Sequence, residues 1–89
     1  MKNRSRTEIV SQILQTAMGS NGARKTQIMY NAFLTYAQLK EYLTILIDKD
    51  LLDYDLDTST FKTSKKGLRF LEIYNNLGPI IIQEEEQLL

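Results

Sequence analysis

The sequence contains no cysteine and no histidine. Without cysteine, the chain has neither a disulfide framework nor a thiolate metal site. Without histidine, it lacks the usual general base at neutral pH and the commonest zinc ligand. We therefore expect that the protein is not an enzyme and that it holds no metal ion and no cofactor.

Long hydrophobic runs are also missing. No apolar stretch approaches the roughly 20 residues that a helix needs to span a bilayer. The opening segment, MKNRSRTEIV, contains basic side chains but lacks the hydrophobic part of a signal peptide. The sequence therefore predicts a cytoplasmic protein without a membrane segment. Its 89 residues, 43% of them hydrophobic, allow one compact domain with a single modest core.

Positive and negative charges balance over the whole chain but not along it. Residues 1–47 hold six basic and two acidic side chains, whereas residues 48–57 hold five aspartates and one lysine. Residues 58–72 are basic again, and three glutamates stand at 84–86. A neutral chain whose charges lie in separate blocks can still present a basic face.

Apolar side chains at helical spacing predict a first helix over residues 7–18. Its inward face is expected to hold Ile9, Val10, Ile13, Leu14, Ala17 and Met18. Four polar residues are expected to face water: Glu8, Ser11, Gln12 and Gln15. The segment GSNG at 19–22 ends this helix, because glycine and asparagine tolerate the left-handed conformation. A short second helix is predicted over residues 23–31, with Ile28, Met29 and Ala32 on its buried side.

A third helix is predicted over residues 36–49, with Thr35 as its N-cap. Its inward face is expected to hold Leu39, Leu43, Leu46 and Ile47. Its outward face is expected to hold Ala37, Gln38, Glu41, Thr44, Ile45 and Asp48, with Lys40 at the boundary. A short helix, a brief turn and a longer helix with a polar outer face are typical of a helix-turn-helix.

Alternating side chains follow, and they predict a β-hairpin. Three apolar residues, Leu52, Tyr54 and Leu56, alternate with three aspartates, Asp53, Asp55 and Asp57. Residues 57–59 supply a turn, and residues 60–63 form the returning strand. The aspartate spacing also resembles a calcium-binding loop. We reject that alternative, because Thr58 stands where the loop needs glycine and Ser64 where it needs glutamate.

A fourth helix is predicted from about Ser64, with a wide apolar band. A heptad-like seam runs along it through Phe70, Tyr74, Leu77, Ile81 and Leu88, which predicts dimerisation through this helix. The pair Gly78-Pro79 interrupts the helix, because proline lacks the amide donor. The helix either kinks there or ends, and a new segment begins. The apolar residues beyond it either cover a partner subunit, fold back on their own core or form a disordered tail.

Two stretches carry a more specific resemblance: GARKTQIMYNAFLTYAQLKEYLTILIDKDLL and FKTSKKGLRFLEIYNNL. They resemble the small archaeal winged-helix proteins that are predicted transcriptional regulators. They are also similar to the related dimeric chromatin-associated proteins of Sulfolobus. The likeness covers about residues 4–77. It combines the segment 22–26 opening the second helix, 34–36 opening the third, and Thr63-x-x-x-Gly67 opening the last.

The resemblance implies a mainly α winged helix-turn-helix: a three-helix core, a two-stranded wing and a C-terminal helix. Residues 1–77 would form the DNA-binding domain, and residues 78–89 a C-terminal extension, a kinked helix or a dimerisation segment. The resemblance also implies double-stranded DNA as the partner, a homodimer through an antiparallel coiled coil of the terminal helices, and a nucleoid-associated protein. This chain departs from the chromatin-associated members because its terminal helix is short and is interrupted at Gly78-Pro79.

A DNA role assigns the polar residues of the first three helices to specific contacts. Arg24, Lys25 and Thr26 stand at a helix start, where free amides and the positive dipole end already attract a phosphate. Base contacts are expected from the third helix, through Thr35, Gln38, Lys40, Glu41 and Thr44, with the Tyr36 hydroxyl near a phosphate. Flanking cations are Lys62, Lys65, Lys66 and Arg69. The three aspartates of the hairpin predict little wing insertion.

A second function class stays open at this point. A winged helix also serves as a protein-interaction module, since a fold does not fix a function. Net neutrality and the acidic hairpin favour that alternative, a module within a transcription complex. The two classes differ in their response to salt, because DNA binding weakens steeply as salt rises.

Overall fold

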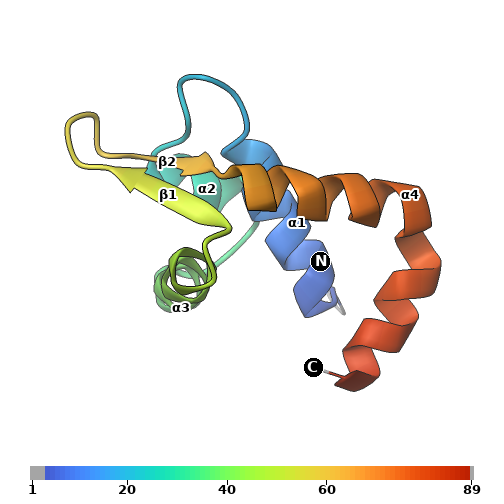
Figure 1. Cartoon of the computed structure of the whole chain (residues 1–89). Helices are drawn as coiled ribbons and strands as arrows, with labels where there is room; N and C mark the ends of the chain where they lie inside the picture. Colours follow the sequence, from blue (N-terminus) through green and yellow to red (C-terminus); the bar gives the residue numbers. More distant parts are fainter. Residues whose placement is uncertain (1–3, 89) are drawn as a thin grey trace.

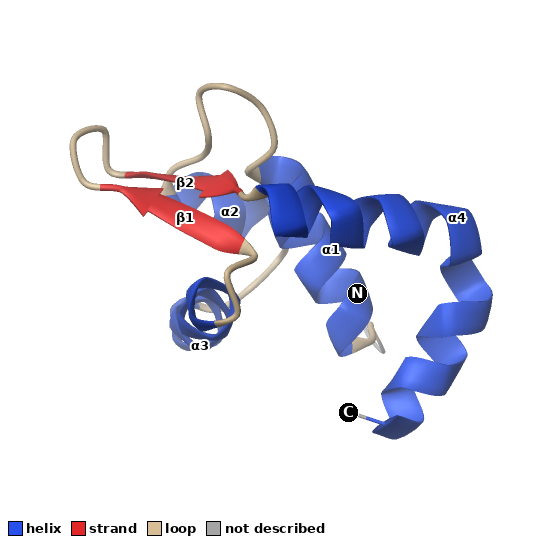
Figure 2. Cartoon of the chain, viewed as in Figure 1, coloured by secondary structure: helices blue, strands red, loops and turns tan. Residues whose placement is uncertain are grey.

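The computed structural model describes the backbone of residues 4–88 and the side chains of residues 4–76. The elements in chain order are α1 (Arg6–Thr16), α2 (Lys25–Asn31), α3 (Tyr36–Asp48), β1 (Leu52–Asp55), β2 (Thr60–Thr63) and α4 (Lys65–Leu88). Figures 1 and 2 show the hairpin projecting from one end of the helical body. The predicted fold class, mainly α with a small β-hairpin, is confirmed.

One hydrophobic core joins all six elements. Burying apolar side chains stabilises a fold by about 25 cal/mol per Å² removed from water. The core side chains come from every helix, from both strands and from the segments between them: Ile13, Leu14, Ala17, Ala23, Ile28, Ala32, Leu34, Leu39, Leu43, Leu46, Leu52, Phe61 and Leu71. No buried polar side-chain atom among the described residues lacks a hydrogen-bond partner.

Helix α1 begins and ends earlier than the periodicity predicts. A capping box fixes its start, because the Ser5 hydroxyl accepts from the Glu8 amide and the Glu8 carboxylate accepts from the Ser5 amide. The helix ends at Thr16, so Met18 does not continue the inward face and is exposed. Ser11 is buried, although it was expected to face water. It lies four residues after Thr7 and therefore shares that residue's buried face.

The start of α2 is tied to the hairpin. Ala23 does not begin the helix as predicted. It forms a β-bridge with Phe61 through two backbone hydrogen bonds, of 2.8 and 2.7 Å. Gly22 has a φ of 68°, and a Cβ there would lie 2.6 Å from the Phe61 carbonyl oxygen. Only glycine fits this close approach, which fixes α2 beside β2.

The turn between α2 and α3 is a Schellman motif. The Leu34 amide donates to the Met29 carbonyl at 3.0 Å, and the Phe33 amide donates to the Tyr30 carbonyl at 3.3 Å. Phe33 has a φ of 55°, in the left-handed region that usually holds glycine. The motif ends α2 and starts α3 within four residues, which sets the two helices of the helix-turn-helix.

Helix α3 follows the prediction closely. Thr35 is its N-cap, and Leu39, Leu43 and Leu46 are buried. Ile47 is exposed and was wrongly expected on the inward face. The core lies on the Leu39–Leu46 side, and Ile47 is rotated by 100° from its neighbour Leu46 in a helix of 3.6 residues per turn.

The hairpin is buried only at its base. β1 and β2 pair antiparallel, with Leu52 opposite Thr63 and Tyr54 opposite Phe61. Leu52 and Phe61 are buried, whereas Tyr54 is exposed and Leu56, which lies in the turn, is 82% exposed. The predicted strand alternation is therefore correct at Leu52 and wrong for the burial of Tyr54 and Leu56. Beyond the base, the strands project past the helices that would cover them.

Helix α4 starts where the hairpin meets the end of α3. The Ser64 hydroxyl donates to the Asp50 carbonyl and accepts from the Gly67 amide. A Cβ on Gly67 would lie 2.4 Å from the Leu51 carbonyl oxygen, so this junction requires glycine. Two predicted apolar residues of α4, Leu68 and Ile73, are exposed, whereas Leu71 is buried.

The backbone of α4 remains helical through Gly78 and Pro79 and bends about midway along its length (Figure 1). Of the two alternatives that the sequence left open, the structure has the kink, which proline explains through its missing amide donor and its ring. None of the described helices has the length and apolar character needed to cross a bilayer.

Candidate nucleic-acid interface

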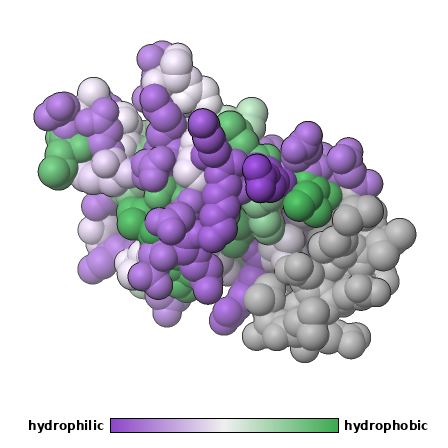
Figure 3. Space-filling view, in the orientation of Figure 1, coloured by the Kyte–Doolittle hydropathy of each residue, from purple (hydrophilic) through white to green (hydrophobic). Residues whose placement is uncertain are grey.

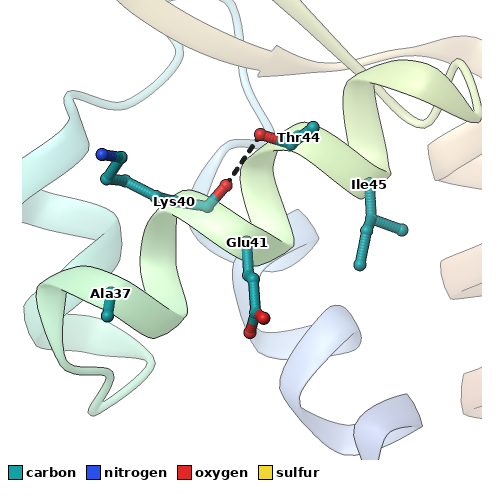
Figure 4. Close-up of a pocket in the computed structure, with 5 residues that line it drawn as sticks. All are labelled: Ala37, Lys40, Glu41, Thr44 and Ile45. Atoms are coloured by element: carbon teal, nitrogen blue, oxygen red, sulfur yellow. Dashed lines mark hydrogen bonds between the residues drawn. The ribbon is translucent and has the colours of Figure 1, made fainter.

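The outer face of α3 is an exposed polar surface. Gln38, Lys40, Glu41 and Thr44 are all exposed, as is Ala37. An open, shallow hollow lies along this face, lined by Ala37, Lys40, Glu41, Thr44 and Ile45 (Figure 4). A helix with such a face, free of covering elements, has the shape that fits a major groove about 12 Å wide.

Several of these side chains already make local hydrogen bonds. The Thr35 hydroxyl accepts from the Gln38 amide at 3.2 Å, and the Gln38 side-chain oxygen accepts from the Thr35 amide at 3.0 Å. The Thr44 hydroxyl donates to the Lys40 carbonyl at 2.9 Å (Figure 4). The side-chain NH2 of Gln38 is therefore the group that remains for an outside acceptor, while its oxygen completes a capping box.

Lys40 lies beside an aromatic ring. Its ammonium nitrogen is 5.5 Å from the centroid of the Tyr36 ring. This distance is within the range of a cation–π contact, which holds the charge near the start of α3. No basic side chain of α2 or α3 makes an ion pair with a carboxylate of residues 4–76, so these charges stay available to an outside anion.

The start of α2 presents two cations. Arg24 occupies the N-cap position, and the Gln27 side-chain oxygen accepts from the Arg24 amide at 3.4 Å. A guanidinium has no acceptor, so it cannot cap the first-turn amides as serine or aspartate does. Arg24, Lys25 and Thr26 are all exposed. An uncapped helix start with adjacent cations favours an anion.

The remaining predicted cations lie in different places. Lys62 stands opposite Asp53 in the hairpin, on the face turned away from the buried Phe61. Lys66 donates to the Lys49 carbonyl at 3.0 Å and so lies at the end of α3 away from Thr35. Lys65 and Arg69 are exposed on the first turns of α4. The structure therefore places Lys40 beside Tyr36 near the start of α3 and Lys66 at the opposite end of that helix.

The predicted dimerisation residues are described only in part. Phe70 and Tyr74 are half-buried, with ring centroids 6.3 Å apart, and Phe70 packs against the monomer's own core. The side chains of Leu77, Ile81 and Leu88 lie outside the described residues.

The hairpin tip, which we define as residues 53–57, is acidic and partly apolar. The Asp57 amide donates to the Asp55 carboxylate at 2.9 Å, which closes a local turn. Figure 3 shows a hydrophobic patch at the hairpin's end among hydrophilic neighbours. No group of three acidic side chains in the described part of the chain is arranged to hold a metal ion.

Two features near the turn between α2 and α3 were not predicted from the sequence. Arg4 reaches α2, where its guanidinium donates to the Ala32 and Phe33 carbonyls. It also contacts the Gln12 side-chain oxygen. Phe33, in the turn between α2 and α3, has a largely exposed ring. The sequence carried a signal for the second feature, because an aromatic residue next to a helix C-cap is unusual.

Comparison with known families gives a match over most of the chain. A family model described as winged helix-turn-helix matches residues 3–81. A comparison with curated proteins finds no match.

Proposed function

Because the chain belongs to the winged helix-turn-helix family, we propose that it binds duplex DNA and regulates transcription. The observation that carries the proposal is the outer face of α3, which is exposed, polar and uncovered along the helix. In this proposal α3 lies in the major groove, as the second helix of a helix-turn-helix does. The lineage we propose is archaeal, close to the chromatin-associated Sulfolobus proteins.

Phosphate contacts come from the start of α2. Arg24, Lys25 and the Thr26 hydroxyl meet the backbone of one strand, where they supply affinity without reading sequence. The uncapped amides of the first turn support this assignment. The bridge between Ala23 and Phe61 holds this helix start in place relative to the hairpin.

Base contacts come from α3. Lys40 reaches guanine or a phosphate, and the Gln38 NH2 donates to an acceptor on a base edge. A bidentate contact from Gln38 to adenine requires its oxygen to leave the capping box. Thr35, Tyr36, Glu41 and Thr44 complete the surface. Lys62 is the one cation that we assign to the hairpin's contact with DNA, and Lys65 and Lys66 flank the far end of α3.

We also propose that the chain forms a homodimer through α4. Its interface would contain Phe70, Tyr74, Leu77, Ile81 and Leu88. Two recognition helices then bind successive major grooves about 34 Å apart. A cytoplasmic, nucleoid-associated location follows from DNA as the partner. Sedimentation of the chain with and without residues 78–89 tests the seam, and equal masses would refute it.

A salt titration tests the DNA contacts. The affinity for a random duplex is measured across salt concentrations for the natural sequence and for Arg24→Ala with Lys25→Ala. Each phosphate contact contributes about 0.9 to the slope of log affinity against log salt. We expect the double variant to bind all sequences more weakly and to lose about two units of slope. Arg6→Ala, which removes an exposed cation of α1 that has no assigned DNA contact, is the matched control and keeps the slope.

The acidic hairpin tip supports a second candidate, a module that binds another protein. Asp53, Asp55 and Asp57 surround Leu56, which is 82% exposed. In that case, binding to the random duplex stays weak and changes little with salt. The same titration therefore separates the two candidates.

A further inference from the structure

Three exposed aromatic rings surround the turn between α2 and α3. Tyr30, Phe33 and Tyr36 are 71%, 64% and 57% exposed, respectively. We call these three residues the aromatic turn patch. Aromatic side chains are normally among the main contributors to burial in a core or an interface. Three exposed rings within seven residues of the chain offer apolar area that the core of the monomer does not cover.

The left-handed backbone conformation of Phe33 costs free energy, and its ring is not buried in the core to compensate. It takes the left-handed position of the Schellman motif with a φ of 55°. The end of α3 has the same motif, with the Leu51 amide donating to Leu46 and Asp50 at the left-handed position with a φ of 64°. Aspartate tolerates that conformation, whereas for a bulky residue it is strained. Because the Phe33 ring is mostly exposed, burial in the monomer's core does not explain its presence.

Cations flank two of the three rings of the patch. The Arg4 guanidinium donates to the carbonyls of Ala32 and Phe33 and lies 6.0 Å from the centroid of the Phe33 ring. Lys40 lies 5.5 Å from the centroid of the Tyr36 ring. Two of the three rings therefore stand beside a positive charge, and the turn that carries them is fixed by hydrogen bonds.

Exposed aromatic faces next to cations suit single-stranded nucleic acid. Unpaired nucleobases stack on aromatic rings, while the phosphates between them meet lysine and arginine. Bases inside a duplex cannot do so, because their faces are covered by their neighbours. Tyr36 and Lys40 also belong to the proposed duplex surface, so the patch continues that surface past the start of α3.

We propose that the aromatic turn patch binds unpaired bases of DNA, beside the duplex contacted by α3. The protein then prefers DNA in which a few pairs are opened over fully paired DNA. This inference goes beyond duplex binding and does not need it, because the patch makes its own contacts with the opened strand.

The test compares two fluorescently labelled DNAs of equal length. One is fully paired, and the other has a central mismatched bubble, so both carry the same number of phosphates. Binding is measured by fluorescence anisotropy at one salt concentration. We expect the natural sequence to bind the bubble about tenfold more tightly, because stacking is favourable for each base that reaches a ring.

The decisive variant is Phe33→Asn. Asparagine adopts the left-handed conformation readily, so the variant folds and its thermal midpoint does not fall. We expect it to lose the preference for the bubble and to keep the affinity for paired DNA. Phe33→Tyr retains a ring and retains the preference. Asp50→Asn, the matched change at the other Schellman motif, alters neither affinity.

Four outcomes would overturn the proposal. The natural sequence binds both DNAs equally, or Phe33→Asn keeps the preference. Tighter binding to a single-stranded RNA than to DNA of the same sequence would assign the patch to another ligand. Self-association that Phe33→Asn abolishes, without any bubble preference, would assign it to a second copy of the chain. If the bubble is preferred while paired DNA is not bound, this proposal stands and duplex binding fails.

Discussion

The surface formed by α2 and α3 and the hairpin tip are both exposed, but their chemistry differs. The helix surface carries Arg24, Lys25 and Lys40 without carboxylate partners among residues 4–76. The hairpin tip carries three aspartates around an exposed leucine. The hairpin reaches past the core, so its outer part is not constrained by packing. Its acidic side chains therefore disfavour close contact with phosphate, whereas the cations of the helix surface favour it.

The junction of the hairpin with α4 holds the two regions together, and breaking it should have the largest effect. A Cβ on Gly67 would lie 2.4 Å from the Leu51 carbonyl oxygen and 2.6 Å from the Thr63 methyl carbon. Overpacking of this kind costs about 1–3 kcal/mol. We expect Gly67→Ala to lower the free energy of unfolding by that amount in a denaturant titration. Lys65→Ala, an exposed change in the same turn of α4, leaves it within about 0.5 kcal/mol. A stable Gly67→Ala would show that the junction tolerates movement.

Neutralising the hairpin tip should strengthen DNA binding. Asp53→Asn with Asp57→Asn removes two charges and retains Asp55, whose carboxylate closes the local turn. We expect the affinity for duplex DNA to rise about threefold to tenfold at low salt, because removing two negative charges lowers the long-range repulsion between the protein and the phosphates. Glu72→Gln on the exposed side of α4 is the control for net charge. Because the control removes one charge and the double variant two, an equal rise per charge removed would mean that the hairpin tip has no special effect on DNA binding.

Substitutions at Gln38 separate capping from base contact. Gln38→Ala removes both the capping-box oxygen and the outward NH2, and we expect a loss of about 0.5–1 kcal/mol in stability together with an altered preference among DNA sites. Gln38→Glu retains a capping oxygen but replaces the NH2 by an acceptor oxygen and adds a negative charge, so its change of preference among duplexes, and not its overall affinity, reports on base contact. Competition binding with a library of duplexes measures the preference. A uniform weakening for all duplexes would count against base contact.

The smallest effect is expected at the apolar end of the hairpin. Leu56 is 82% exposed and lies in the turn, so Leu56→Ser should change the free energy of unfolding by less than about 0.5 kcal/mol. DNA affinity should also stay unchanged. A measurable loss of DNA affinity would mean that this leucine inserts into a groove and that the hairpin tip, like α3, contacts DNA.

Local patterns predicted the helix-turn-helix well. The sequence Thr35-x-x-Gln38 is a capping box, and the spacing of Leu39, Leu43 and Leu46 marks one helical face, so α3 follows from neighbours alone. Alternation and turn residues also predicted the hairpin, although β1 ends at Asp55 and Leu56 lies in the turn. These features depend on residues only a few positions apart in the sequence, so the local pattern of side chains is enough to predict them.

Other features depend on distant parts of the chain and could not be predicted. The Arg4 guanidinium bonds to the carbonyl of Ala32, 28 residues away. Ser11 is buried because the folded chain covers the face that it shares with Thr7. Tyr54 and Leu56 follow the alternation of a half-buried strand, but no helix extends far enough to cover them. In each case tertiary geometry decides the environment, and the local pattern does not contain it.

The contrast between the two surfaces is tested most directly by NMR of isotope-labelled protein titrated with a short duplex. We predict that amide signals of residues 24–26 and 35–44 shift as DNA is added and that those of residues 53–57 do not. Shifts concentrated at residues 53–57, with the signals of α3 unchanged, would contradict the assignment of α3 as the DNA-binding helix.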